Sequence, residues 1–198
     1  MSKASLVVLI SGRGSNMIAI ANACASGELN AQISLVISNE KNAAGIDAAK
    51  KLGIDTCVIE HTAYPNREAF DSALAQRVAL ANPDWIALAG FMRILGEEFV
   101  ATWPGKILNI HPSLLPLYPG LNTHQRALDA GDKVAGATVH IVTGTLDDGP
   151  IFAQVKVPIF AQDTAQSLAQ RVIKEEHALY VYVLKHCTTK TSIQDNYT

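Results

Sequence analysis

Short apolar runs alternate with longer amphipathic segments along the first 110 residues, and this alternation constrains the fold more than any other feature. The apolar runs have the length of buried strands, and the segments between them have the spacing of helices with one buried face. We expect strands at 6–10, 33–37, 56–59, 85–89 and 107–110. We expect helices at 16–25, 43–52 and 67–80, the last with Asn66 as its N-cap. Such alternation predicts a mostly parallel, right-handed α/β sheet.

Two later strands, at 137–142 and 151–157, are joined by a link that is too short for a parallel crossover, so they should pair antiparallel. A long helix follows at 164–184, with Asp163 as its expected N-cap. A length of 198 residues fits a single domain over 1–198. We therefore predict an α/β fold with a mostly parallel, Rossmann-like open sheet and late antiparallel strands.

Charge and composition narrow the possible partners. The net charge of −2 provides no global field that would attract nucleic acid or a membrane surface, so small-molecule substrates are expected. The sequence contains no apolar stretch of about 18 residues, so we expect no transmembrane helix. Cys24, Cys57 and Cys187 lie far apart and form no Cys-x-x-Cys pair, which is typical of free thiols in a cytoplasmic protein. No metal-ligand spacing is found, and a monomer and a homodimer are equally compatible with the sequence.

The turn after the first strand reads Ser-Gly-Arg-Gly-Ser-Asn at 11–16 and opens the first helix. Glycine lets backbone amides approach an anion, and a helix N-terminus offers unpaired N–H groups. Gly14, Ser15 and Asn16 are therefore candidate ligands of a phosphate monoester. A dinucleotide fingerprint would need a third glycine where Met17 stands. The alternative interpretation is a turn that needs glycine only for its geometry, and the role of Arg13 stays open.

The turns after the fourth and fifth strands should lie at the same edge, because ligands of open α/β sheets bind beyond the carboxyl ends of the strands. The apolar run at 89–95, interrupted by Arg93, suits a slot for a flat heterocycle or a plain hydrophobic connection. Asn109 and His111 are two residues apart, so their side chains leave one face of the fifth strand. Both can donate hydrogen bonds, which predicts a two-donor oxyanion site, although a lone histidine is often structural.

Three acidic or basic positions remain to be explained. Asp147 or Asp148, in the turn between the last strands, would raise the pKa of His111 if it lay close, but both suit turn chemistry. Glu176 falls on an apolar helical stripe, where a carboxylate needs a protein donor or a ligand. Arg67 lies in the first turn of its helix, where the helix dipole disfavours a cation, so it is either solvated or paired with an anion.

Together these motifs resemble the family of phosphoribosylglycinamide formyltransferase, also called glycinamide ribonucleotide transformylase, of purine synthesis. The resemblance spans nearly the whole chain and rests on segments at 12–16, 89–95, 109–116, 146–150 and 176–180. It implies the formyltransferase fold and transfer of a formyl group from 10-formyltetrahydrofolate to glycinamide ribonucleotide, on the route to IMP, with no metal.

The resemblance also implies a role for each candidate residue. The acceptor phosphate would lie on the turn at 14–16, and Glu176 would bind the acceptor ribose and amine. The folate site would contain Arg67, which meets the acidic tail, and five residues nearer the ring: Met92, Arg93, Ile94, Leu95 and Asn109. The catalytic residues would be Asn109, His111 and Asp147.

One position departs from the family pattern, because Asn122 stands where some members have a histidine that supports the catalytic aspartate. The sequence does not decide whether Asn122 or His124 supports Asp147. Alternative activities are a formyltetrahydrofolate hydrolase, another formyltransferase such as one acting on charged transfer RNA, and a nucleotide-binding module without catalysis.

Overall fold

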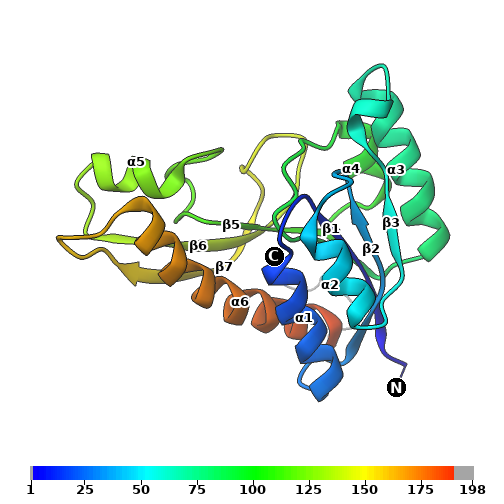
Figure 1. The fold of residues 1–198 in the computed structure, drawn as a ribbon, viewed down its shortest axis with the longest axis horizontal. Coiled ribbons are helices and arrows are strands. Elements are labelled where there is room, and N and C mark those ends of the chain that lie inside the picture. The colour runs from blue at the N-terminus through cyan, green and yellow to red at the C-terminus, as the bar shows by residue number, and fades with distance from the viewer. Residues whose placement is uncertain (1, 190–198) are drawn as a thin grey trace, which may run out of the picture.

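The computed structural model describes residues 2–189, which build a seven-stranded sheet in the order β3-β2-β1-β4-β5-β6-β7 (Figure 1). Strands β1 to β5 run parallel, β6 is antiparallel to β5, and β7 is antiparallel to β6. The strands are β1 (Ala4–Ile10), β2 (Ala31–Ser38), β3 (Thr56–Val58), β4 (Trp85–Leu88), β5 (Ile107–His111), β6 (Val134–Ile141) and β7 (Ile151–Pro158). The predicted mostly parallel sheet with late antiparallel strands is confirmed.

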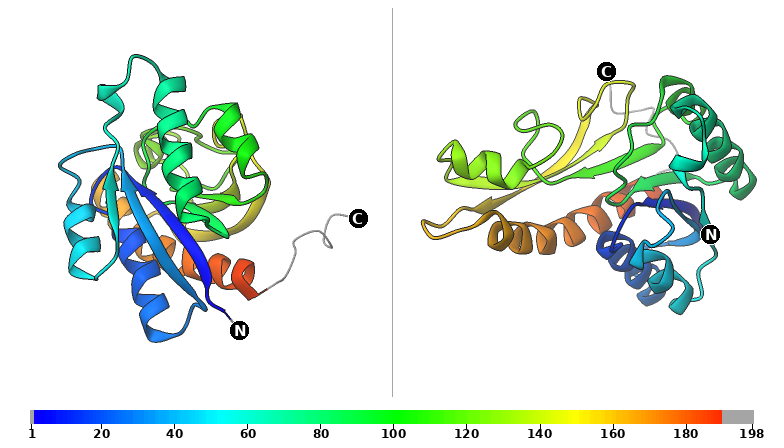
Figure 2. Two further views of the ribbon diagram at one scale, coloured as in Figure 1. Left: turned by 90° about the vertical axis from the view of Figure 1, so that its right-hand side faces the viewer. Right: turned by 45° about the horizontal axis from the view of Figure 1, so that its top comes forward.

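The helices divide between the two faces of the sheet. They are α1 (Ser15–Ser26), α2 (Ala44–Lys51), α3 (Arg67–Ala81), α4 (Glu97–Thr102), α5 (Thr123–Asp129) and α6 (Ala165–Thr189), with a 3₁₀ turn η1 (His61–Ala63). Helices α1, α2 and α6 supply side chains to one hydrophobic core, and α3 and α4 to a second. Figure 2 shows α3 on the opposite side of the central strands from α1 and α2.

Side-chain alternation along β1 explains why its sequence is apolar throughout. Leu6, Val8 and Ile10 enter the core beneath α1, α2 and α6, whereas Val7 and Leu9 enter the core beneath α3 and α4. A parallel strand that is covered by helices on both faces exposes neither face to solvent, so its sequence is a continuous apolar run.

The helix termini agree only in part with the predictions. Asn66 caps α3 as expected, because its Oδ1 accepts from the N–H of Ala69 at 2.9 Å. The expectation that Asp163 caps α6 was wrong, because the Oγ1 of Thr164 accepts from the N–H of Ser167 at 3.1 Å. Asp163 instead forms an ion pair with Arg171 of α6, in which Oδ1 of Asp163 lies 2.7 Å from Nη2 of Arg171. The short helices α4 and α5 were not predicted, since six or seven residues show too little periodicity.

The chain order reverses around β1, which lies between β2 and β4. Connections leave this point to opposite sides, which opens a crevice at the carboxyl ends of the strands. The turn after β1 touches the turn after β4 there, because the N–H of Ser11 donates to the carbonyl of Gly90 at 3.1 Å. Among residues 2–189, no helix combines the length and the apolar character needed to span a membrane.

Candidate active site

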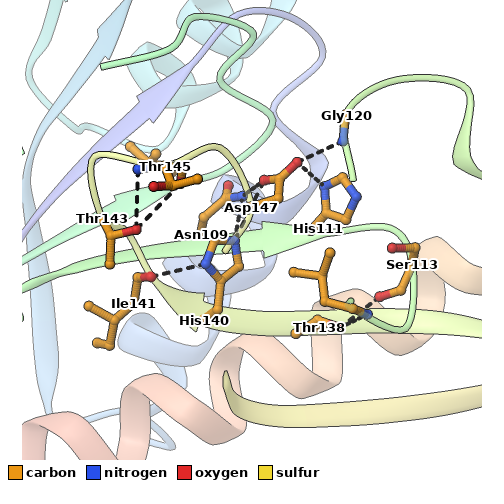
Figure 3. Close-up of polar contacts among 12 residues, drawn as sticks. Asn109, His111, Ser113, Gly120, Thr138, His140, Ile141, Thr143, Thr145 and Asp147 are labelled. Atoms are coloured by element: carbon orange, nitrogen blue, oxygen red, sulfur yellow. Dashed lines mark hydrogen bonds and ion pairs between the residues drawn. The ribbon is translucent and has the colours of Figure 1, made fainter. Parts of the chain in front are cut away.

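The carboxyl end of β5 presents Asn109 and His111 on one face, as the strand period predicts. The antiparallel register sets Asn109 opposite His140 of β6. The turn between β6 and β7 then brings Asp147 back over the same face. Figure 3 shows these four side chains converging from β5, β6 and that turn.

Asp147 is the centre of this cluster. Its Oδ2 accepts from the N–H of Gly120 at 2.8 Å and lies 3.3 Å from Nδ1 of His111. Its Oδ1 lies 3.4 Å from Nδ2 of Asn109. The backbone of Asp147 is left-handed, with φ of 51°, and its side chain is buried while Asp148 is exposed. The geometry therefore distinguishes two aspartates between which the turn sequence could not choose.

The charges of this cluster are set by burial against hydrogen bonding. Burial raises the pKa of Asp147, but the contacts with His140, the Gly120 N–H and His111 outweigh it, and the pKa lies below its ordinary value. Burial lowers the pKa of His111, and the Tyr118 carbonyl and Asp147 offset this effect only in part. Asp147 does raise the pKa of His111, as expected, but desolvation of the ring is the larger effect, so the net pKa lies below its ordinary value.

Both ring nitrogens of His111 face oxygen atoms. Nε2 lies 2.9 Å from the carbonyl oxygen of Tyr118, and Nδ1 faces Asp147. Only the doubly protonated ring can donate to both. In the structure, therefore, the donor at Nε2 is engaged by the segment that follows β5.

His140 is a member of the cluster that sequence reasoning missed. Its Nδ1 lies 3.0 Å from the carbonyl oxygen of Ile141, and its Nε2 lies 3.1 Å from Nδ2 of Asn109 and 3.7 Å from Oδ1 of Asp147. The NH₂ group of Asn109 therefore lies between His140 and Asp147. His140 lies on the strand predicted at 137–142. It faces Asn109 only because of the register between β5 and β6, which no local sequence pattern reveals.

Neither Asn122 nor His124, the two residues that the sequence offered as supports for Asp147, belongs to the cluster. In the described part of the chain, the partners of Asp147 are Asn109, His111, Gly120 and His140 rather than Asn122 or His124. Asn122 is exposed and begins α5 in a left-handed conformation. His124 is half-buried in the first turn of α5, and burial lowers its pKa.

The turn after β1 opens into a cleft of about 760 Å³. Gly14 is left-handed, with φ of 71°, and a Cβ there would lie 3.0 Å from Cα of Gly45, so this position needs glycine. Asn16 donates from Nδ2 to Oε2 of Glu176 at 2.8 Å, which joins α1 to α6. The cleft is lined by residues 11–16 and by Gly90, Met92, Glu176 and His177, among others.

The sequence allowed Glu176 to be satisfied either by a protein donor or by a ligand, and its position in the structure is compatible with both. It is 8% exposed and has a protein donor in Asn16, yet it also lines the cleft. Burial raises its pKa, and the hydrogen bond from Asn16 counteracts this only partly. The Oδ1 of Asn16 is buried without a partner among the described residues, so the pair still has one hydrogen-bond acceptor to satisfy.

A second, smaller cleft of about 80 Å³ lies on the other side of the segment that follows β4. Its lining includes Arg93, Ile94 and Leu95 together with Asn109, His140 and Asp147. Met92, which the family resemblance assigns to the same slot, lines the first cleft instead.

Arg67 lies farther out, in a hollow of about 420 Å³ between α3 and α4. This hollow shares Leu95 and Gly144 with the smaller cleft, so the two are neighbours. The Arg67 side chain is half exposed, and its Nε lies 3.9 Å from Oε1 of Glu68. Within residues 2–189, no group of three or more His, Cys, Asp or Glu side chains is arranged to hold a metal ion.

Comparisons with known proteins agree with this architecture. A model of the formyl transferase family matches residues 4–184. The phosphoribosylglycinamide formyltransferase of Escherichia coli strain K12 is 46% identical over 180 residues, covering 91% of this chain and 85% of that protein. The crystal structure of glycinamide ribonucleotide transformylase 1 from Symbiobacterium toebii is similar with a TM-score of 0.93 and 40% identity, covering 98% of this chain and 92% of that one. The phosphoribosylglycinamide formyltransferase of Brucella melitensis gives a TM-score of 0.90 and 46% identity, covering 96% of this chain and 98% of that one.

Proposed function

The chain belongs to the phosphoribosylglycinamide formyltransferase family, and from this premise we propose that it transfers the formyl group of 10-formyltetrahydrofolate to the amine of glycinamide ribonucleotide. The observation that carries the proposal is the cluster of Asn109, His111 and Asp147 at the end of β5, beside two clefts of different character. The larger cleft has an anion-binding turn and the buried carboxylate of Glu176, and the smaller one combines apolar side chains with the polar groups of Asn109, His140 and Asp147.

The acceptor binds in the larger cleft. Backbone N–H groups at the start of α1, with Gly14, Ser15 and Asn16, hold the phosphate. Glu176 receives a ribose hydroxyl or the amine, and its buried position makes such a hydrogen bond stronger than it would be in water.

The formyl donor binds in the smaller cleft. The folate ring lies against Ile94 and Leu95, with Arg93 and Asn109 providing polar contacts. The acidic tail passes over Leu95 toward Arg67, because the hollow that contains Arg67 adjoins this cleft.

The reaction is a direct displacement at the formyl carbon. The acceptor amine forms a new C–N bond, the formyl oxygen becomes negative in a tetrahedral intermediate, and the bond to the folate nitrogen breaks. The proton that the amine loses moves to the leaving folate nitrogen. Asn109 and His111 donate to the oxyanion, a contribution for which losing one donor typically costs about 10²–10³ in rate.

Two existing hydrogen bonds must be exchanged for this to happen. His111 must give up the Tyr118 carbonyl at Nε2, and Asn109 must turn part of its NH₂ group away from its long contact with Asp147. Negative charge on the formyl oxygen favours the imidazolium form of His111, which donates at once to that oxygen and to Asp147. The buried carboxylate of Asp147 thus holds the ring in the orientation that the reaction needs.

The test is to incubate the protein with 10-formyltetrahydrofolate and measure loss of the formyl group with and without glycinamide ribonucleotide. We expect turnover only when the acceptor is present, with formylglycinamide ribonucleotide as product. Equal turnover in water alone would identify a hydrolase, and binding of nucleotide without turnover would identify a binding module. Either result contradicts the proposal.

A further inference from the structure

The segment after β4, residues 89–93, lies between the two clefts and forms a wall that separates them. Ala89, Gly90 and Met92 line the larger cleft, whereas Phe91 and Arg93 line the smaller one. Any displacement of this segment therefore changes the distance between what the two clefts hold. In a direct displacement, attack requires the reacting atoms to be about 3–3.5 Å apart, so the position of the wall matters for rate.

Ser11 holds this wall at two points. Its backbone N–H donates to the carbonyl of Gly90 at 3.1 Å. Its hydroxyl oxygen accepts from the N–H of Met92 at 2.7 Å. Side chain and backbone of one residue thus clamp a three-residue stretch of the wall.

The Ser11 hydroxyl is itself oriented by a hydrogen bond to the side chain of Asn39. Its single proton is donated to Oδ1 of Asn39, which leaves the oxygen lone pairs for the Met92 N–H. Asn39 is 2% exposed, and its Nδ2 lies 3.2 Å from Oε1 of Glu40 and 3.2 Å from Nδ1 of His61. A hydroxyl with a fixed proton direction is a better acceptor at a fixed place than one that rotates.

The phosphate-binding turn has its own support, independent of the Ser11 hydroxyl. The N–H of Gly45 donates to the carbonyl of Gly12 at 3.0 Å, and the backbones of Gly14 and Gly45 pack closely. Removal of the hydroxyl should therefore loosen the wall and leave the turn in place.

We propose that Ser11 is a positioning residue for formyl transfer, which fixes the Gly90–Met92 wall and so sets the distance between donor and acceptor. The inference rests on the proposed function, because it takes the two clefts as the acceptor and donor sites. Ser11 acts through Met92 and touches neither reacting atom.

The experiment compares Ser11→Ala with Ser5→Ala. Ser5 lies at the other end of β1, and its hydroxyl donates to Oγ of Ser34 at 3.0 Å, so the control also loses one part-buried serine hydrogen bond. We expect kcat of Ser11→Ala to fall about tenfold, since small misplacements cost much in rate, and KM for glycinamide ribonucleotide to change less than about twofold. Ser11→Thr, which keeps the hydroxyl, should recover most of the lost rate. A kcat equal to that of Ser5→Ala overturns the proposal, as does a loss confined to KM, which would make Ser11 a phosphate ligand.

A double-mutant cycle tests the path through Asn39. Asn39→Ala should lower kcat less than Ser11→Ala does, and the double variant should match Ser11→Ala alone, because both changes act on one hydroxyl. Fully additive losses contradict a shared path.

Hydrogen exchange separates this inference from the proposed function. The Met92 amide should exchange about tenfold faster in Ser11→Ala than in Ser5→Ala, with no substrate present. If the wild-type protein transfers no formyl group, the proposed function fails while the exchange result still tests the clamp. Unchanged exchange at Met92 refutes the clamp whatever the activity.

Discussion

Replacing Asp147 with asparagine removes one negative charge from the centre of the cluster and keeps the size of the side chain. The carboxylate lies 3.3 Å from Nδ1 of His111, and unit charges at that separation attract by about 5 kcal/mol at an effective dielectric constant of about 20. Part of this attraction is offset by the cost of keeping the carboxylate buried. If about 3–4 kcal/mol of it acts on the imidazolium of the transition state, Asp147→Asn lowers kcat by about 10²–10³.

The assay is steady-state turnover at saturating concentrations of both substrates, with binding of glycinamide ribonucleotide measured separately by calorimetry. Asp148→Asn is the matched control, because Asp148 is the exposed neighbour in the same turn. We expect Asp147→Asn to lose kcat and keep acceptor affinity within about threefold, since the proposed phosphate site lies on another element. A kcat of Asp147→Asn within about tenfold of wild type, or an equal loss in Asp148→Asn, would refute the electrostatic role given to Asp147.

Three further predictions concern binding and stability. Glu176→Gln should raise KM for glycinamide ribonucleotide about tenfold, because a neutral amide oxygen is a weaker acceptor than a carboxylate; steady-state kinetics with saturating folate measure this, and an unchanged KM would exclude Glu176 from the acceptor site. Burial lowers the pKa of His111, His124 and His177 below the ordinary 6.5, so the folded state binds fewer protons than the unfolded chain just below that pH. Stability should therefore fall as pH drops from about 7.5 to about 6, which calorimetry can measure; a flat or rising Tm would contradict the sign. Tyr180→Phe should lower the free energy of unfolding by about 1–3 kcal/mol in urea titrations, because the single proton of the fully buried hydroxyl is shared between the carbonyls of Leu108 in β5, at 2.9 Å, and Leu88 in β4, at 3.2 Å. No loss would mean that this hydrogen bonding contributes nothing net to stability.

The features predicted from sequence are those that depend on local period. Alternation of apolar runs predicted the strands, and spacing by two placed Asn109 and His111 on one face. An acid on an apolar helical stripe predicted that Glu176 would be buried. Each of these inferences needs only residues within one element.

The features that sequence could not predict depend on pairing between distant elements. His140 lies opposite Asn109 only because of the register of β5 and β6. The Tyr118 carbonyl lies against His111 in a segment where Tyr118 has a left-handed backbone, with φ of 55°, a conformation that a tyrosine rarely adopts and that the sequence pattern does not predict. The net pKa of His111 depends on how far the folded chain desolvates the ring, which no local pattern reports.

The hydrogen bond between Asn16 and Glu176 joins residues 160 positions apart and has a consequence for synthesis of the chain. A ribosome adding about 5–20 residues per second delivers Glu176 on the order of ten seconds after Asn16. During that interval the turn after β1 lacks the carboxylate that completes its cleft. A nascent chain that has not yet reached Glu176 therefore lacks one side of the proposed acceptor site, and the cleft is completed only after α6 has been made and has packed against α1.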